Sequence, residues 1–155
     1  MKYTEAQVVF EEVPDEITLA INISNCPVRC EGCHSPHLWQ DIGTELTDTE
    51  LKRLIDSNKG ITCVAIMGGN ANEIRVYELL KIIHELGLKT CWYSGRNNVY
   101  PPMKDILDYV KLGPYIKNLG GLDSSISNQR FFRIVNGKYE DLTYRFKTKK
   151  NEIKN

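Results

Sequence analysis

Residues 61–95, ITCVAIMGGNANEIRVYELLKIIHELGLKTCWYSG, contain the unit that decides the fold. Residues 61–69 are an apolar run that ends in two glycines, and residues 88–95 are a second apolar run that ends in Ser-Gly. Between them, apolar residues recur at helical spacing over residues 72–87, where Gly87 ends the pattern. The stretch predicts a strand, a helix and a second strand that runs parallel to the first.

The segments before this unit extend the alternation of strand and helix. Residues 17–24, ITLAINIS, are apolar and β-branched and predict a buried strand. Residues 45–56, ELTDTELKRLID, predict a helix. Thr47 and Glu50 have the spacing of a capping box at its start, and Gly60 is a natural stop after it.

The segments after residue 95 follow a weaker pattern. Residues 103–110 predict a short helix that runs into a strand near 109–116. Residues 131–135 and 139–146 each predict a strand, and Asn136-Gly137 between them is typical of a hairpin turn.

The whole chain, residues 1–155, is expected to form a single α/β domain with parallel strands. In such folds ligands bind at the carboxyl ends of the strands. The loops that follow the three predicted strands carry three cysteines, Gly68-Gly69-Asn70 and Ser94-Gly95-Arg96. Topology alone therefore predicts that these three loops converge on one site.

Composition narrows the class of protein. Lys+Arg and Asp+Glu both number 20, so the net charge gives no electrostatic reason to expect a nucleic acid or a membrane surface as partner. The N-terminal residues contain no apolar run of signal-peptide length, and no run reaches the roughly 20 apolar residues of a membrane span. We expect a cytoplasmic protein, in which clustered cysteines indicate metal binding or catalysis more than disulfides.

The loop after the first predicted strand holds three of the five cysteines, as Cys26-x3-Cys30-x2-Cys33. Thiolates select zinc, copper(I) or iron–sulfur clusters. A four-iron cluster normally takes four cysteines, so three of them would leave one iron open to a small molecule. An open metal position indicates reactivity, as a closed one indicates structure.

Two other readings of this loop stay open at the level of the sequence. Cys26, Cys30, Cys33 and His37 have the spacing of a structural Cys3His zinc site. His34 is a poorer zinc ligand, because it adjoins Cys33 and cannot easily turn its ring to the same ion. Three unliganded buried thiols fit less well, because the residues between the cysteines form a polar, turning loop.

The cysteine spacing after a first strand resembles the cluster motif of the radical S-adenosylmethionine (SAM) superfamily. The resemblance is closest to its small members, the activating enzymes of anaerobic ribonucleotide reductase, and covers roughly residues 17–133. These enzymes carry a C-x3-C-x-G-C loop followed by a ring residue and a tryptophan, here His34 and Trp39. The short chain, Gly68-Gly69 and the Asn-Gln-Arg at 128–130 are similar to that family as well.

The resemblance implies a fold, a chemistry and partners. The fold would be a partial (β/α) barrel of the radical SAM type, truncated below the roughly 250 residues of a full barrel and open to a large client. Cys26, Cys30 and Cys33 would bind a [4Fe-4S] cluster whose open iron chelates SAM. One electron from the reduced cluster would cleave the sulfonium to methionine and a 5′-deoxyadenosyl radical, which takes a hydrogen atom from a glycine of the client.

The client implied by the resemblance is the glycyl-radical subunit of anaerobic ribonucleoside-triphosphate reductase, with a low-potential donor such as flavodoxin as the source of electrons. An activase of another glycyl-radical enzyme, such as pyruvate formate-lyase, is an alternative with the same chemistry. A non-catalytic zinc module that binds a partner protein is the alternative from a different class.

The same resemblance implies a set of residues around SAM. They are, in chain order, Gly32, His34, Gly68, Gly69, Asn70 and Ser94. Asn70 departs from the family's Gly-Gly-Glu or Gly-Gly-Asp, whose carboxylate receives the cofactor's ammonium, and Glu73 in the next helical turn is a candidate substitute. Gly68-Gly69 as a simple turn, and Ser94 as a turn residue without ligand contact, are the competing readings.

The remaining distinctive residues have plainer interpretations. Cys63 and Cys91 lie inside apolar strands and are expected to be small, inert core residues. Trp39 is expected to pack over the cysteine loop rather than to act in catalysis. Residues 128–130 contact the partner in one reading and are simply exposed in the other.

Overall fold

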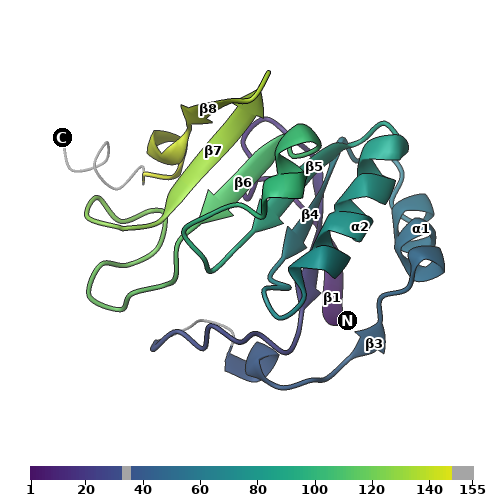
Figure 1. Cartoon of the computed structure of the whole chain (residues 1–155), viewed down its shortest axis with the longest axis horizontal. Coiled ribbons are helices and arrows are strands. Elements are labelled where there is room, and N and C mark those ends of the chain that lie inside the picture. Colours follow the sequence, from purple (N-terminus) through teal and green to yellow (C-terminus); the bar gives the residue numbers. More distant parts are fainter. Residues whose placement is uncertain (33–35, 148–155) are drawn as a thin grey trace.

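The computed structural model describes residues 1–32 and 36–147, which form one mixed sheet of eight strands in the order β3-β1-β2-β4-β5-β6-β7-β8 (Figure 1). The strands are β1 Lys2–Val9, β2 Thr18–Ile23, β3 Thr44–Glu45, β4 Cys63–Met67, β5 Lys89–Tyr93, β6 Tyr109–Leu112, β7 Arg130–Val135 and β8 Lys138–Asp141. The helices are α1 Asp48–Asp56 and α2 Glu73–Glu85, with 3₁₀ turns η1 Pro36–Trp39, η2 Pro101–Asp105 and η3 Thr143–Phe146.

The centre of the sheet is parallel. β2 pairs with β4, β4 with β5, and β5 with β6, each in parallel register. One row across these strands contains Ala20, Ala65, Cys91 and Tyr109. This pairing confirms the direction that the alternation of strand and helix predicts, and it brings the carboxyl ends of the four strands to one edge.

The two margins of the sheet differ from the parallel expectation. β1 pairs antiparallel with β2 and with β3, while β7 pairs antiparallel with β6 and with β8. β3 and β8 are the two outer strands, so the sheet is open rather than closed into a barrel. The β7–β8 hairpin has the predicted turn, with positive φ of 51° at Asn136 and 75° at Gly137.

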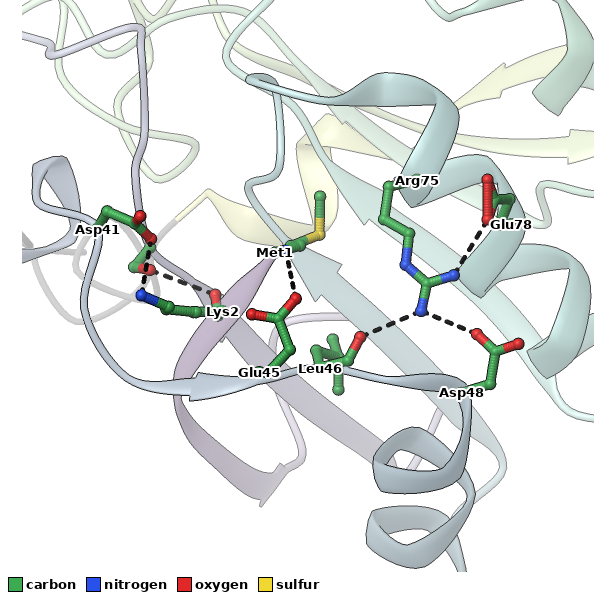
Figure 2. Close-up of polar contacts among 9 residues, drawn as sticks. Met1, Lys2, Asp41, Glu45, Leu46, Asp48, Arg75 and Glu78 are labelled. Carbon is green, nitrogen blue, oxygen red and sulfur yellow. Dashed lines mark hydrogen bonds and ion pairs between the residues drawn. The ribbon is translucent and has the colours of Figure 1, made fainter.

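The sequence did not predict the long strand β1 or the two-residue strand β3. The burial pattern of β1 shows no clean alternation of buried and exposed residues. The Met1 ammonium bonds Glu45 at 3.0 Å and the Lys2 ammonium lies 3.7 Å from the Asp41 carboxylate (Figure 2). These contacts hold β3 and the segment before it against β1.

Both α-helices cover one face of the sheet (Figure 1). The side chains between the helices and this face form the larger core. Arg75 on α2 joins the two helices, since its guanidinium donates to Leu46 O at 3.1 Å, Asp48 at 2.8 Å and Glu78 at 3.1 Å (Figure 2). Neither helix has the length and hydropathy that a membrane crossing requires, among the residues that the structure describes.

The start of α1 confirms half of the predicted capping box. Thr47 Oγ1 accepts a hydrogen bond from Glu50 N at 3.0 Å. The second bond expected of a capping box, in which the Glu50 carboxylate accepts from Thr47 N, was predicted wrongly. That carboxylate instead accepts from Tyr3 Oη at 3.0 Å and from Arg53, because β1 brings a phenol within its reach.

Within residues 1–32 and 36–147, no α-helix covers the opposite face of the sheet. Strand alternation sends Cys63, Ala65 and Cys91 to this side, where they pack with Val13 and Phe131. The Phe146 ring of η3 lies 4.9 Å from the Phe131 ring. Residues from the β1–β2 loop and from η3 therefore close the second core.

Two predicted elements are wrong in type. Residues 101–105 form the short 3₁₀ turn η2 in place of the helix expected over 103–110. The strand expected near 109–116 is confirmed as β6, which ends at Leu112. The predicted strand 139–146 ends at Asp141 and continues as η3. Asp141 Oδ1 accepts from Thr143 N at 2.8 Å, and this local bond turns the chain out of the sheet.

Candidate functional site

The cysteine loop leaves the carboxyl end of β2 and is closed at its base by η1. Asn25 N donates to Gln40 O at 2.9 Å, and Cys26 N donates to Leu38 O at 2.8 Å. Asn25, just before Cys26, and Arg29, just before Cys30, have positive φ of 58° and 46°, so the chain turns sharply ahead of each of these cysteines. Cys26 and Cys30 are partly exposed and free, whereas Cys33 and His34 lie outside the described residues.

The loop after β6 contacts the cysteine loop. Tyr115 N donates a hydrogen bond to Cys30 Sγ at 3.3 Å. Gly32 has φ of +75°, and a Cβ there would lie 3.3 Å from both Tyr115 Cε1 and Lys117 Cγ. An N–H donor stabilises negative charge on sulfur, so the environment of Cys30 fits a thiolate that ligates iron.

The Gly68-Gly69 turn follows β4 and depends on both glycines. Their φ angles are +108° and +90°, a region that side chains disfavour. A Cβ at Gly69 would lie 2.5 Å from Val76 Cγ2, so this glycine lets α2 approach the turn. Trp92 Nε1 donates to Gly68 O at 2.7 Å and fixes the carbonyl of the turn.

Asn70 joins the loops after β4 and β5. Its Nδ2 donates to Ser94 Oγ at 2.9 Å, and its Oδ1 accepts from Gly95 N at 3.0 Å. The residue is 7% exposed and Ser94 is fully buried. Ser94 Oγ also accepts from Arg96 N at 3.0 Å. The Asn70 and Ser94 side chains therefore stabilise the loops after β4 and β5 by bonding within them.

A groove of about 950 Å³ lies where the three loops meet. Val28 of the cysteine loop contacts the β5 loop, since a Cβ at Gly95 would lie 2.8 Å from Val28 Cγ2. The lining comprises Val28, residues 70–74, residues 95–101 and Pro114. The predicted convergence of the three loops is confirmed.

The structure places some of the predicted site residues at the groove and others away from it. Gly32 lies against the β6 loop, Gly68 and Gly69 form the turn after β4, and Asn70 lines the groove. Ser94 is buried beneath the groove and is absent from its lining. His34 falls outside the described residues.

Sequence reasoning missed three contributors. Asn97 and Asn98 lie in the loop after β5 and line the groove. Lys111, next to the last residue of β6, donates from Nζ to Ser94 O at 2.8 Å and to Gly113 O at 3.1 Å. The only signal for the asparagines is their position after a predicted strand. Lys111 gives none, because it lies in a strand that the sequence places imprecisely.

The zinc reading with His37 gains no support from this geometry. Cys26, Cys30 and His37 are all within the described part of the chain, where no three His, Cys, Asp or Glu side chains gather as a metal-binding group. His37 lies on η1, which the bonds to Asn25 and Cys26 hold at the base of the loop.

Comparison with protein-family models identifies the class. Residues 17–112, well over half of the chain, match the model described as 4Fe-4S single cluster domain. This match and the cysteine loop define an iron–sulfur protein with a 4Fe-4S cluster as its cofactor. The chain belongs to the 4Fe-4S single cluster domain family, which is found in radical SAM-type proteins. Neither the curated proteins nor the solved structures gave a match.

Cys63 and Cys91, the two cysteines inside strands, are expected not to react with alkylating reagents in the folded protein. Burial raises the pKa of the Cys63 and Cys91 thiols well above the ordinary value, so the reactive thiolate is scarce at pH 8. In the folded protein kept reduced without added iron, iodoacetamide is expected to label Cys26 and Cys30 and to spare the strand pair until denaturant is added. Mass spectrometry of the peptides checks this, and equal labelling of Cys63 before unfolding would contradict it.

Proposed function

We propose that this protein is a glycyl-radical activase that binds SAM at a [4Fe-4S] cluster held by Cys26, Cys30 and Cys33, with anaerobic ribonucleoside-triphosphate reductase as its client. The observation that carries the proposal is a three-cysteine loop without a fourth cysteine, placed where the loops after β4 and β5 also converge. When bound, the reduced cluster supplies the electron that cleaves SAM to methionine and a 5′-deoxyadenosyl radical.

The groove beside the cysteine loop suits a polar small molecule. Its volume of about 950 Å³ lies at the upper end of the range for small-molecule sites. Asparagine amides and the backbone of the β4 and β5 loops line it. The Gly68-Gly69 turn directly precedes Asn70, the first residue of the β4 loop in this lining.

Glu73 is the residue we assign to the ammonium of SAM. The Asn70 oxygen already accepts from Gly95 N, and its amide group already donates to Ser94. Glu73 is partly exposed at the start of α2 and is the acidic side chain among the described residues that line the groove. Asn70 Nδ2 lies 3.5 Å from Glu73 Oε1, so the amide also orients the carboxylate.

Glu73→Gln is therefore expected to weaken SAM binding about tenfold to a hundredfold, the range of one hydrogen bond to a charged group. Equilibrium dialysis against the oxidised, cluster-loaded protein measures this without turnover. Glu78→Gln is the matched control, because Glu78 lies on the same helix and bonds only Arg75 in the described structure. Unchanged affinity in Glu73→Gln, with loss in Asn70→Ala, would assign the ammonium to Asn70.

The open sheet is consistent with a large client. We propose that the parallel strands β2, β4, β5 and β6 are the remnant of the (β/α) barrel of radical SAM enzymes, truncated and flanked by antiparallel strands. With β3 and β8 as free outer strands, a glycine loop of another protein has an open side by which to reach the groove. The cysteine loop and the loop after β6 contact each other through Cys30 Sγ and Tyr115 N.

The client is tested directly. The cluster-loaded protein is incubated without oxygen with SAM, a low-potential reductant and the reductase, and the glycyl radical is counted by electron paramagnetic resonance. Pyruvate formate-lyase in place of the reductase is the parallel sample. A radical on the reductase alone supports the proposal, and a radical on pyruvate formate-lyase alone would move the protein to the other activase class.

A further inference from the structure

The turn after β6 reaches a cluster ligand through its backbone. Gly113, Pro114 and Tyr115 form this turn, and Tyr115 N is the donor to Cys30 Sγ at 3.3 Å. Gly113 N donates to Arg96 O at 2.7 Å, which ties the turn to the β5 loop as well. The position of the Tyr115 N–H relative to Cys30 Sγ thus depends on the contacts that hold this turn.

Two side chains of residues 128–130 hold this turn. Asn128 Nδ2 donates to Pro114 O at 3.0 Å, and Gln129 Nε2 donates to Gly113 O at 3.4 Å. Gln129 is 8% exposed, and its backbone N–H donates to Ser127 Oγ at 3.0 Å. Gln129 is therefore buried and Asn128 partly buried, and both side chains bond the turn within the protein.

We propose that Asn128 and Gln129 are positioning residues that hold the Gly113–Tyr115 turn so that Tyr115 N–H bonds the Cys30 sulfur and raises the reduction potential of the cluster. The proposal rests on the proposed function only in taking Cys30 as a ligand. A hydrogen bond to a ligand sulfur is stronger when the cluster carries the additional electron, so it favours the reduced state. Asn128 and Gln129, one reading of which was a contact with the client, thus hold a turn within the protein.

Tyr115 offers a matched pair of variants. Tyr115→Pro removes the N–H, whereas Tyr115→Ala retains it, and both variants lose the ring that lies beside Gly32. The readout is the fraction of reduced cluster, followed by electron paramagnetic resonance, as the applied potential is lowered. At a fixed potential Tyr115→Pro is expected to show an about two- to tenfold lower ratio of reduced to oxidised cluster, the range of one hydrogen bond.

Asn128→Ala tests the positioning step without touching the cysteine contact. It is expected to lower the same ratio in the same direction by a smaller factor, because the turn is still held by Gln129 and Arg96. Asn58→Ala is the control, because it removes the same kind of bond, from Asn58 Nδ2 to Leu54 O just after α1, and it is expected to match the unsubstituted protein. Tyr115→Ala, which keeps the N–H, is expected to show a higher ratio than Tyr115→Pro.

The outcomes separate this inference from the proposed function. Normal iron and sulfide content with unchanged potentials in both Tyr115→Pro and Asn128→Ala would overturn the inference alone. Should Tyr115→Pro fail to fold, the potential of Asn128→Ala decides. Failure of the unsubstituted protein to hold iron and sulfide would overturn the proposed function instead.

Discussion

Alanine at any one of Cys26, Cys30 or Cys33 is expected to abolish the iron–sulfur cluster. The anaerobically reconstituted protein should hold about four iron and four sulfide per chain, and each variant should fall close to none. The reason is the ligand count, because a cube held by three thiolates cannot lose one and stay in the loop. Iron and sulfide analysis, with the visible absorption of the cluster, measures the loss.

Cys91→Ala is the matched control for these three variants. Cys91 is fully buried in β5, on the face of the sheet packed by Val13 and Phe131, so its loss removes a thiol without touching the cysteine loop. It is expected to retain the full cluster and the release of methionine from SAM under reduction. A loop variant that kept its iron, sulfide and turnover would refute the assignment of that cysteine.

Gly69→Ala is expected to lower the free energy of unfolding by about 3 kcal/mol, the second large effect. The added methyl group would lie 2.5 Å from Val76 Cγ2, on the buried side of α2, and the residue would be strained at φ of +90°. The shift of the urea midpoint, followed by tryptophan fluorescence of the cluster-loaded protein, gives the size of the effect.

Gly68→Ala separates the two causes of that loss. Gly68 has φ of +108°, yet a Cβ there would meet nothing closer than Ile23 O at 3.4 Å. Strain alone is expected to cost about 1–2 kcal/mol, so Gly68→Ala should unfold at a higher urea concentration than Gly69→Ala. Equal midpoints would mean that the approach of α2 to the turn does not set the requirement for glycine at position 69.

The parallel core was predictable because its signals are local. Apolar runs mark β2, β4 and β5, the last two ending in glycine, and the helical spacing over residues 72–87 marks α2. The loops at the strand ends then had to meet, whatever their side chains. β1 and η2 were not predicted correctly, because pairing with distant strands and a run of two prolines decide them.

The sequence predicted which loops form the site but not the hydrogen bonds between them. The cysteine spacing predicted a metal site and left zinc open, and the resemblance to radical SAM enzymes favoured the 4Fe-4S cluster that the family match supports. Asn70 is hydrogen-bonded to Ser94 and Gly95, in a loop 24 residues further along the chain. These bonds depend on the distance between the two loops, which the sequence does not give. The contact of Tyr115 with Cys30 spans 85 residues, and no local pattern reports such a distance.

The account depends on an iron atom that accepts SAM, and the direct measurement is the cleavage of SAM by the reduced protein. Under anaerobic reduction, in the absence of any client, the account predicts the release of methionine and 5′-deoxyadenosine in equal amounts. A protein that holds and reduces its cluster but leaves SAM intact would contradict it, as would a chain that binds one zinc ion and no sulfide.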